Sequence, residues 1–343
     1  MADSGVVRTG DSIRKALDTL LINHSSFSTA LRSLQRRVQD TLSGFPPCFE
    51  VVIGFSRCGK TELLKLIAQD YPERSENGRR YVPVLVVYIT SSTTPKDLPL
   101  AVIRALRLPP PRHSMKVGEL NEYMHTQIRL AKVHVILFDE ASHLVEVGTK
   151  IPPRAASDWF KDVQANAKDL GIVLTGVPRL RRLPDSNEQL RNRTRKPIKL
   201  MPYRWDNREQ RVSFCACASA FLSEFTSRGC ELSIPFNNFV RHCYAASAGQ
   251  VGLLANFFSE LAMLIDEPCL LNLEICADAA ANLNLPGNKT VLPFTSEELD
   301  DISLMQVLVS EYAIYDLVLP PISVESELAY GRVHNGLTPG MAG

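Results

Sequence analysis

The eight residues Gly54-Phe55-Ser56-Arg57-Cys58-Gly59-Lys60-Thr61 follow the pattern G-x-x-x-x-G-K-[ST]. An apolar run, 49–53, precedes them, and a helix-like run, 62–68, follows. This order predicts a strand, a tight loop and a helix. In such a loop the backbone N–H groups surround phosphate groups, and the positive N-terminal end of the helix points at them. The stretch therefore predicts a site for the phosphates of a nucleotide.

The side chains at the end of this loop have expected roles of their own. Lys60 would reach the outer phosphates, and the hydroxyl of Thr61 would hold magnesium. The alternative is a chance match to a common pattern, and the flanking strand and helix count against it. We expect ATP and Mg²⁺ as ligands, contacted by Gly54, Ser56, Arg57, Cys58, Gly59, Lys60, Thr61 and Glu62.

The composition is that of a folded protein with a sizeable core. The chain has 343 residues, of which 45% are hydrophobic and 22% charged, enough for one large or two medium domains. No apolar run approaches the length of a membrane span, and the N-terminus lacks a basic-then-apolar signal sequence. We therefore expect a cytoplasmic protein without a membrane partner.

The eight cysteines show no C-x-x-C pair and no Cys/His ligand spacing, which argues against a zinc site. Buried, reduced thiols are the default expectation for them. Cys58 is the exception, because an exposed thiol inside the phosphate loop is open to oxidation.

Charge is unevenly distributed along the chain. The formal net charge is +1, but residues 294–343 hold eight acids against one base, which leaves +8 for residues 1–293. A mildly basic body with an acidic tail permits contact with nucleic acid without establishing it.

The pattern of apolar residues predicts alternating strands and helices that give way to a purely helical region. We expect strands at 49–53, 82–89, 133–138, 171–175 and 197–201, and helices at 13–22, 27–42, 62–68, 97–106, 119–130, 155–170, 206–227, 237–246, 251–265 and 273–283. Residues 72–80 read as a polar turn. The last 50 or so residues, with Pro293, Pro320 and Pro321, read as a partly extended arm or a loosely attached segment. The expected domains are a helical lead-in (1–45), an α/β nucleotide-binding domain (46–204), a helical lid (205–285) and an acidic extension (286–343).

Two further strand ends carry polar side chains suited to this chemistry. The strand at 133–138 runs into Asp139 and Glu140, a Walker B pattern in which Asp139 holds the magnesium shell and Glu140 polarises the attacking water. The alternative is a strand that ends in a solvated acidic turn. Thr175, at the tip of the next strand, either lies beside the γ-phosphate or simply ends its strand.

Three stretches together resemble the TniB/TnsC family, the ATP-dependent transposition regulators of bacterial mobile elements. They are Gly54 to Thr61, Phe138-Asp139-Glu140-Ala141-Ser142-His143-Leu144, and Asn187-Glu188-Gln189-Leu190-Arg191-Asn192-Arg193. The first is common to many ATPases, whereas the other two are narrower. The resemblance implies the AAA+ P-loop NTPase fold, a doubly wound parallel sheet followed by a small helical lid.

The same resemblance implies a function. Such proteins bind and hydrolyse ATP, assemble into rings or helical filaments on double-stranded DNA, and connect target-site selection by a TniQ-like protein to a DDE-type transposase. Lys60, Thr61, Asp139 and Glu140 fall on the Walker positions of the family.

Three other positions are compared with the family one by one. Arg193 falls on the arginine offered to the ATP of a neighbouring subunit, although an arginine-rich run such as 179–211 is usually a solvated face. Lys96 lies where the family contacts the DNA backbone; its alternative is an ordinary exposed lysine at a helix start. Leu253 replaces a basic residue that senses ATP from the lid, so either hydrolysis is slow or lid closure depends on another group.

Two other functions remain open at this stage. One is a helicase-loader-like AAA+ protein, which would also bind DNA. The other is a nucleotide-dependent signalling switch that never touches DNA.

Overall fold

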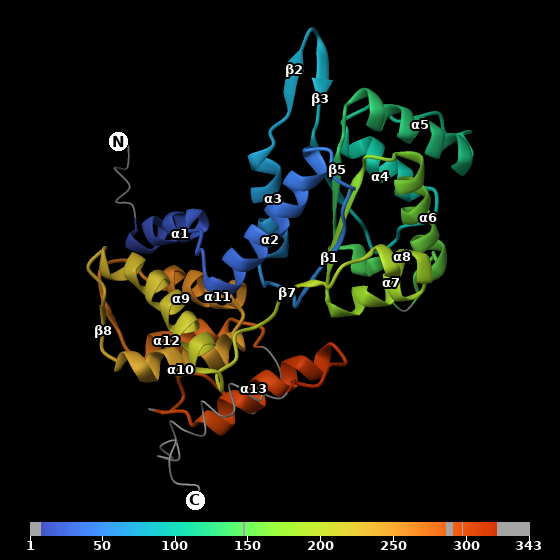
Figure 1. Cartoon of the computed structure of the whole chain (residues 1–343). Coiled ribbons are helices and arrows are strands. Elements are labelled where there is room, and N and C mark those ends of the chain that lie inside the picture. The colour runs from blue at the N-terminus through green and yellow to red at the C-terminus, as the bar shows by residue number, and fades with distance from the viewer. Residues whose placement is uncertain (1–7, 147, 286–290, 297, 321–343) are drawn as a thin grey trace, which may run out of the picture. The chain divides into compact units, whose positions relative to one another are not determined.

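A computed structural model gives the structure of the protein and describes residues 8–146, 148–285, 291–296 and 298–320 (Figure 1). The described chain forms two compact units. The α/β unit comprises residues 23–201, and the helical unit comprises residues 8–22 together with the described residues from 202 onward. The segment expected as one helical lead-in is shared between the two units. The division into four domains stays a prediction.

A five-stranded sheet forms the centre of the α/β unit, with the strand order β4-β5-β6-β1-β7 and parallel pairing throughout (Figure 1). The strands are β1 (Phe49–Gly54), β4 (Val84–Tyr88), β5 (Val135–Asp139), β6 (Gly171–Gly176) and β7 (Ile198–Leu200). Every residue of β1, β5 and β6 is buried, which explains why the sequence of these strands is mostly apolar. The expected doubly wound sheet is confirmed.

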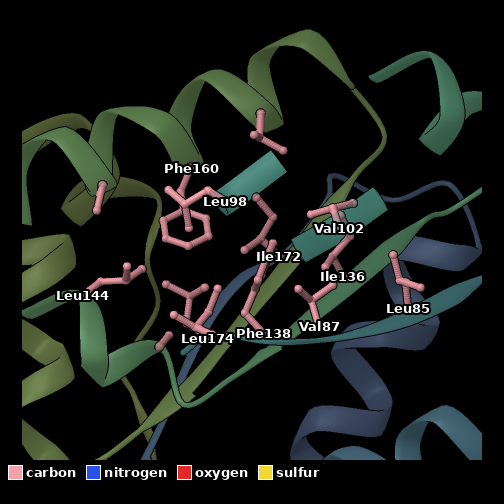
Figure 2. Close-up of a cluster of buried hydrophobic side chains, with 14 of the residues drawn as sticks. Leu85, Val87, Leu98, Val102, Ile136, Phe138, Leu144, Phe160, Ile172 and Leu174 are labelled. Carbon is pink, nitrogen blue, oxygen red and sulfur yellow. The ribbon is translucent and has the colours of Figure 1, made fainter. Parts of the chain in front are cut away.

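Helices connect the parallel strands, since parallel neighbours need a crossover between them. The connecting helices are α3 (Lys60–Asp70), α4 (Asp97–Ala105), α5 (Val117–Leu130) and α6 (Pro153–Asn166), together with the short helices η1 (Ala141–Val145), η2 (Pro178–Arg181), α7 (Arg182–Asp185) and α8 (Glu188–Arg193). One further helix of the unit, α2 (Ser25–Leu42), precedes β1. Figure 2 shows side chains from α4 and α6 packed on one face of the sheet. Phe160 of α6 meets Phe138 of β5 edge-on, with 5.1 Å between the ring centroids. Burial of each such ring contributes about 1.5–3 kcal/mol.

The polar turn expected at 72–80 is wrong in one respect. It forms an antiparallel hairpin of β2 (Arg74–Glu76) and β3 (Arg79–Tyr81), which stands out from the α/β unit in Figure 1. Asn77 and Gly78 take positive φ at its tip, as a two-residue hairpin turn requires. The strands were missed because none of their side chains is buried, so no apolar alternation marks them.

The helical unit is built from six helices and one short parallel strand pair within its described residues. The helices are α1 (Thr9–Thr19), α9 (Arg208–Thr226), α10 (Phe236–Ser247), α11 (Val251–Met263), α12 (Leu273–Ala281) and α13 (Asp301–Ile314), and the strands are β8 (Glu231–Leu232) and β9 (Leu270–Leu271). Gly10 of α1 lies so close to α11 that a Cβ would stand 1.9 Å from the carbonyl oxygen of Ala262. None of the described helices is long and apolar enough to cross a membrane.

The partly extended arm expected at the end of the chain is also wrong where the structure describes it. Residues Asp301–Ile314 form α13, which Asp300 caps by accepting a 2.6 Å hydrogen bond from the Ser303 N–H. Leu304 and Leu308, one helical turn apart, are buried. The prolines that favoured an extended reading lie outside this helix.

Candidate nucleotide-binding site

The phosphate loop joins the end of β1 to the start of α3. Gly59 caps α3 with φ +87°, a left-handed conformation that a residue with a Cβ rarely adopts. Gly54 has another reason to be glycine: a Cβ there would lie 2.3 Å from the carbonyl oxygen of Leu200 on β7. The two glycines of the pattern are therefore explained by the positive φ at Gly59 and the close approach of β7 at Gly54.

Lys60 turns its side chain into this loop. Its ammonium donates to the carbonyl oxygens of Gly54, at 3.1 Å, and of Phe55, at 2.8 Å, and the side chain is 5% exposed. Burial lowers the pKa of Lys60, and the negative charges of Asp139 and Glu140 oppose that shift. A buried cation that faces two carboxylates suits a ligand that brings several negative charges.

Asp139, at the end of β5, is the centre of a hydrogen-bonded cluster. Its Oδ2 accepts a 2.7 Å bond from the hydroxyl of Thr61, and its Oδ1 accepts a 2.5 Å bond from the hydroxyl of Thr175. The two threonines come from α3 and β6, so three elements, α3, β5 and β6, meet at one carboxylate. Asp139 is 1% exposed and Thr175 is fully buried. The structure thus brings together Lys60, Thr61, Asp139 and Thr175.

Glu140 follows directly in a left-handed conformation with φ +54°. Its backbone N–H donates a 2.9 Å bond to Asp139 Oδ1, so the turn that carries the Glu140 carboxylate is tied to the same cluster. A non-glycine residue at positive φ, such as Glu140, is uncommon and is found more often at functional sites.

Ser142 in η1 explains part of the narrower motif. It is buried against Gly176, where a Cβ would come within 2.8 Å of the Ser142 hydroxyl.

The residues present fit a magnesium ion and a polyphosphate. Mg²⁺ prefers oxygen ligands, and the oxygens of Thr61 and Asp139 lie 2.7 Å apart in this cluster. The loop between Gly54 and Lys60 turns at the N-terminus of α3, which favours negative charge. Among the described residues, no group of three or more His, Cys, Asp or Glu side chains could hold a metal by itself, so a bound phosphate would have to complete the shell.

The remaining loop residues divide by exposure. Ser56 and Arg57 are exposed, whereas Cys58 is only 7% exposed. The expectation of an exposed Cys58 thiol is therefore wrong. The thiol lies inside the loop, where solvent does not reach it freely.

Arg193 lies at the end of α8 and is exposed. The motif before it anchors this short helix: Asn187 caps α8 by accepting from the Gln189 and Leu190 N–H groups, and its amide donates a 2.7 Å bond to Asp158 of α6. Leu190 is fully buried. These residues fix the helix while its arginines face outward. Among the described residues, the cluster around Asp139 does not include Arg193.

Lys96 lies at the start of α4. Its ammonium donates a 3.0 Å bond to the carbonyl oxygen of His113, and the side chain is partly exposed. Leu253, the other position compared with the family, lies in the first turn of α11 in the helical unit and is partly buried. A leucine there supplies no charge to any ligand.

Two residues near the loop were missed by the sequence reasoning. The ring of Phe27 packs on Gly59, 3.3 Å from where a Cβ would be. His24 caps α2 by accepting from the Phe27 N–H, and burial lowers the pKa of His24 to about 4. No local pattern could have found this packing, because the residues are far from the loop in the sequence.

The comparison with known protein families decides the identity of the chain. Residues 13–204, more than half of the chain, match the family described as "Bacterial TniB protein". The chain belongs to the TniB family. The match spans the phosphate loop, the acidic cluster and α8 of this TniB-family chain. No curated protein sequence matches the chain.

Solved structures share the fold of this TniB-family chain at low sequence identity. Cdc6p from Pyrobaculum aerophilum is 13% identical with a TM-score of 0.58, covering 94% of this chain and 89% of that one. The ORC1 protein of Aeropyrum pernix, solved in complex with DNA, is 16% identical with a TM-score of 0.55, covering 80% and 69%. The ORC2 protein of the same organism, solved as ADPNP-ADP complexes, is 11% identical with a TM-score of 0.53, covering 89% and 79%. The chain therefore has the AAA+ ATPase fold.

Proposed function

We propose that this TniB-family chain binds and hydrolyses ATP at the phosphate loop and uses the cycle to regulate DNA transposition. The observation that carries the proposal is the cluster in which Thr61 and Thr175 both bond Asp139 beside the buried Lys60. A buried carboxylate held by two hydroxyls, facing a buried cation at a helix N-terminus, fits a metal-bound polyphosphate. ATP is the polyphosphate that the family resemblance favours.

Each residue of the site has a separate role in this proposal. Lys60 would exchange its bonds to the loop carbonyls for bonds to the outer phosphates. Thr61 and Asp139 would hold a Mg²⁺ ion, which would supply positive charge beside the phosphoryl group. Glu140 accepts a proton from the attacking water. Thr175 orients Asp139 through its hydrogen bond. It lies on β6, the strand between β1, which leads into the phosphate loop, and β5, which ends in Asp139. Leu253 adds no cation, which is consistent with slow turnover.

The proposal also includes DNA binding and a role in transposition. Membership of the TniB family supports a role in transposition, and the basic charge of +8 over residues 1–293 supports contact with double-stranded DNA. The likeness to a DNA-bound ORC1 structure extends only to the fold. Within this proposal Lys96 contacts the DNA backbone. Its ammonium has three N–H donors and uses one of them for the bond to the His113 carbonyl oxygen, so the others can contact DNA phosphates. A DDE-type transposase and a TniQ-like protein are the proposed partners.

Assembly into a ring or filament would complete the active site. Arg193 is exposed at the end of an anchored helix, and this supports a role at the ATP of a neighbouring subunit. A guanidinium placed there stabilises charge on the phosphoryl group during transfer.

The test of the nucleotide site compares two variants. Lys60→Ala should abolish ATP binding, because the loop loses the cation that reaches the phosphates. Glu140→Gln should keep binding and lose hydrolysis, because an amide cannot accept the proton. Hydrolysis by Glu140→Gln at the rate of the unchanged protein would contradict the assigned role.

The test of the DNA role is electron microscopy with duplex DNA, with and without a non-hydrolysable ATP analogue. Assemblies on DNA that need the analogue support the proposal. A protein that binds ATP and never binds DNA is instead a signalling switch.

A further inference from the structure

Two cysteines of the helical unit lie side by side at the start of the β8–β9 pair. The strands are parallel, with Glu231 opposite Leu270. Cys230 and Cys269 each come one residue earlier. The Glu231 N–H donates a 3.1 Å bond to the carbonyl oxygen of Cys269, so the pairing extends to the cysteines.

The spacing of these strands meets the requirement for a disulfide bond. Neighbouring strands in a sheet lie about 4.8 Å apart. Cα atoms joined by a disulfide are about 4.4–6.8 Å apart. The thiols of Cys230 and Cys269 already face each other, since they form a hydrogen bond. The strand pairing therefore places the two cysteines in a geometry that suits a disulfide bond.

The two thiols differ in their access to solvent. Cys230 is 1% exposed, whereas Cys269 is partly exposed. A reagent in solution meets Cys269 first, and Cys230 stands behind it as the second thiol. Burial raises the pKa of Cys269, and the neighbouring Cys230 raises it further, so reaction speeds up as the pH rises.

The other cysteines of the unit lack this arrangement. Cys215 and Cys217 are two residues apart on α9 and point in different directions. Cys243 and Cys276 are fully buried, so a dissolved reagent does not reach them in the folded unit. The raised pKa of the Cys243 thiol, which burial causes, also keeps it protonated.

We propose that Cys230 and Cys269 are a reversible disulfide site, formed by exchange with a small-molecule disulfide such as oxidised glutathione. The Cys269 thiolate attacks one sulfur of that disulfide, forming a mixed disulfide and releasing one glutathione as its thiol. The Cys230 thiolate then attacks the Cys269 sulfur and releases the second glutathione. Two protein thiols are oxidised, one glutathione disulfide is reduced, and the two protons pass to the leaving thiolates.

The bond would fasten three helices of the unit at one point. Cys230 follows the end of α9, and Cys269 lies between the end of α11 and the start of α12. Closing the loop 230–269 lowers the conformational entropy of the unfolded chain. We therefore expect the disulfide to raise the melting temperature by about 5–10 °C.

The experiment treats the full-length protein with oxidised glutathione at mildly alkaline pH. Pepsin digestion at low pH, which halts exchange, and mass spectrometry should find peptides joined through Cys230 and Cys269, with the protein lighter by two hydrogens. Dithiothreitol should reverse both the bond and the rise in melting temperature.

Two single variants separate the steps. Cys230→Ser should stop at the mixed disulfide, with one glutathione on Cys269, while Cys269→Ser should take up none at Cys230. A mixed disulfide that persists at Cys269 in the unchanged protein would overturn the proposal, as would a bond between any other pair.

Discussion

The hydroxyl of Thr61 donates a 2.7 Å hydrogen bond to Oδ2 of Asp139. The bond joins the first turn of α3 to the end of β5, although β6 separates β5 from β1 in the sheet. Two ligands that would hold one metal ion are thus already in contact, which lowers the cost of arranging them on binding.

This contact leads to a prediction for Thr61→Ala. The Mg²⁺ concentration that half-saturates ATP hydrolysis should rise at least tenfold, because one of two protein oxygens is lost, and stability should fall by about 1 kcal/mol. Thr61→Ser keeps the hydroxyl and should stay near the unchanged protein. Equal Mg²⁺ dependence for Thr61→Ala and the unchanged protein would remove Thr61 from the metal site.

Arg193→Ala should bind ATP normally and lose hydrolysis by about a thousandfold, because a neighbour's guanidinium no longer stabilises the transferring phosphoryl group. Mixed with Lys60→Ala, which is also inactive alone, it should partly regain turnover, since one subunit supplies the pocket and the other the arginine. A mixture that co-assembles and stays inactive would show that Arg193 does not act between subunits.

Lys96→Ala should weaken binding to all DNA sequences alike. The slope of log affinity against log salt should fall by about one unit for each DNA phosphate that is no longer neutralised. Lys65→Ala is the matched control, because Lys65 is an exposed lysine paired with Glu62 on α3. Fluorescence anisotropy at several salt concentrations measures both slopes, and equal slopes would return Lys96 to the ordinary surface.

His24 should make stability depend on pH. Its pKa is lowered from 6.5 to about 4 in the folded protein, so as the pH falls below 6.5 the unfolded chain takes up a proton that the folded chain does not. Stability is therefore complete above about pH 6.5 and falls toward pH 4, by about 1–3 kcal/mol. His24→Asn keeps a capping side chain without a titrating group and should lose this part of the pH dependence. Urea unfolding across the window compares the two, and parallel curves would contradict the assignment.

Two glycines at the second position of their helices should respond oppositely to alanine. At Gly10 a Cβ would lie 1.9 Å from the Ala262 carbonyl oxygen, so Gly10→Ala should destabilise the helical unit by about 1–3 kcal/mol. At Gly118 of α5 nothing stands within 4 Å, so Gly118→Ala should stabilise by about 0.5–1 kcal/mol. Circular dichroism during urea unfolding measures both. A stable Gly10→Ala variant would mean that α1 can move away from α11.

The elements that could be predicted from the sequence are those whose burial leaves a local pattern of apolar residues. Strands β1, β5 and β6 are mostly apolar because both faces of the sheet are covered. The loop pattern at 54–61 was readable because it is a short motif with fixed spacing, and Gly59 within it takes the positive φ that favours glycine.

The features that could not be predicted depend on packing between distant residues or on exposed backbone pairing. The β2–β3 hairpin is held by backbone bonds between polar residues, which leave no apolar period. The packing of Phe27 on Gly59 needs the whole α/β unit to bring α2 to the loop. The bond from Thr175 to Asp139 needed the strand order, since nothing in the sequence says that β6 lies beside β5.

The position of β6 also connects Asp139 to the helices that follow β6 in the chain. Thr175 is the next-to-last residue of β6, and η2 begins two residues after Gly176, at Pro178, with α7 and α8 following it along the chain. Only Gly176 and Val177 lie between Thr175, which donates its hydrogen bond to Asp139, and the start of η2. An inserted residue there would shift the start of η2 relative to β6 while leaving every residue of the phosphate loop in its place in the sequence.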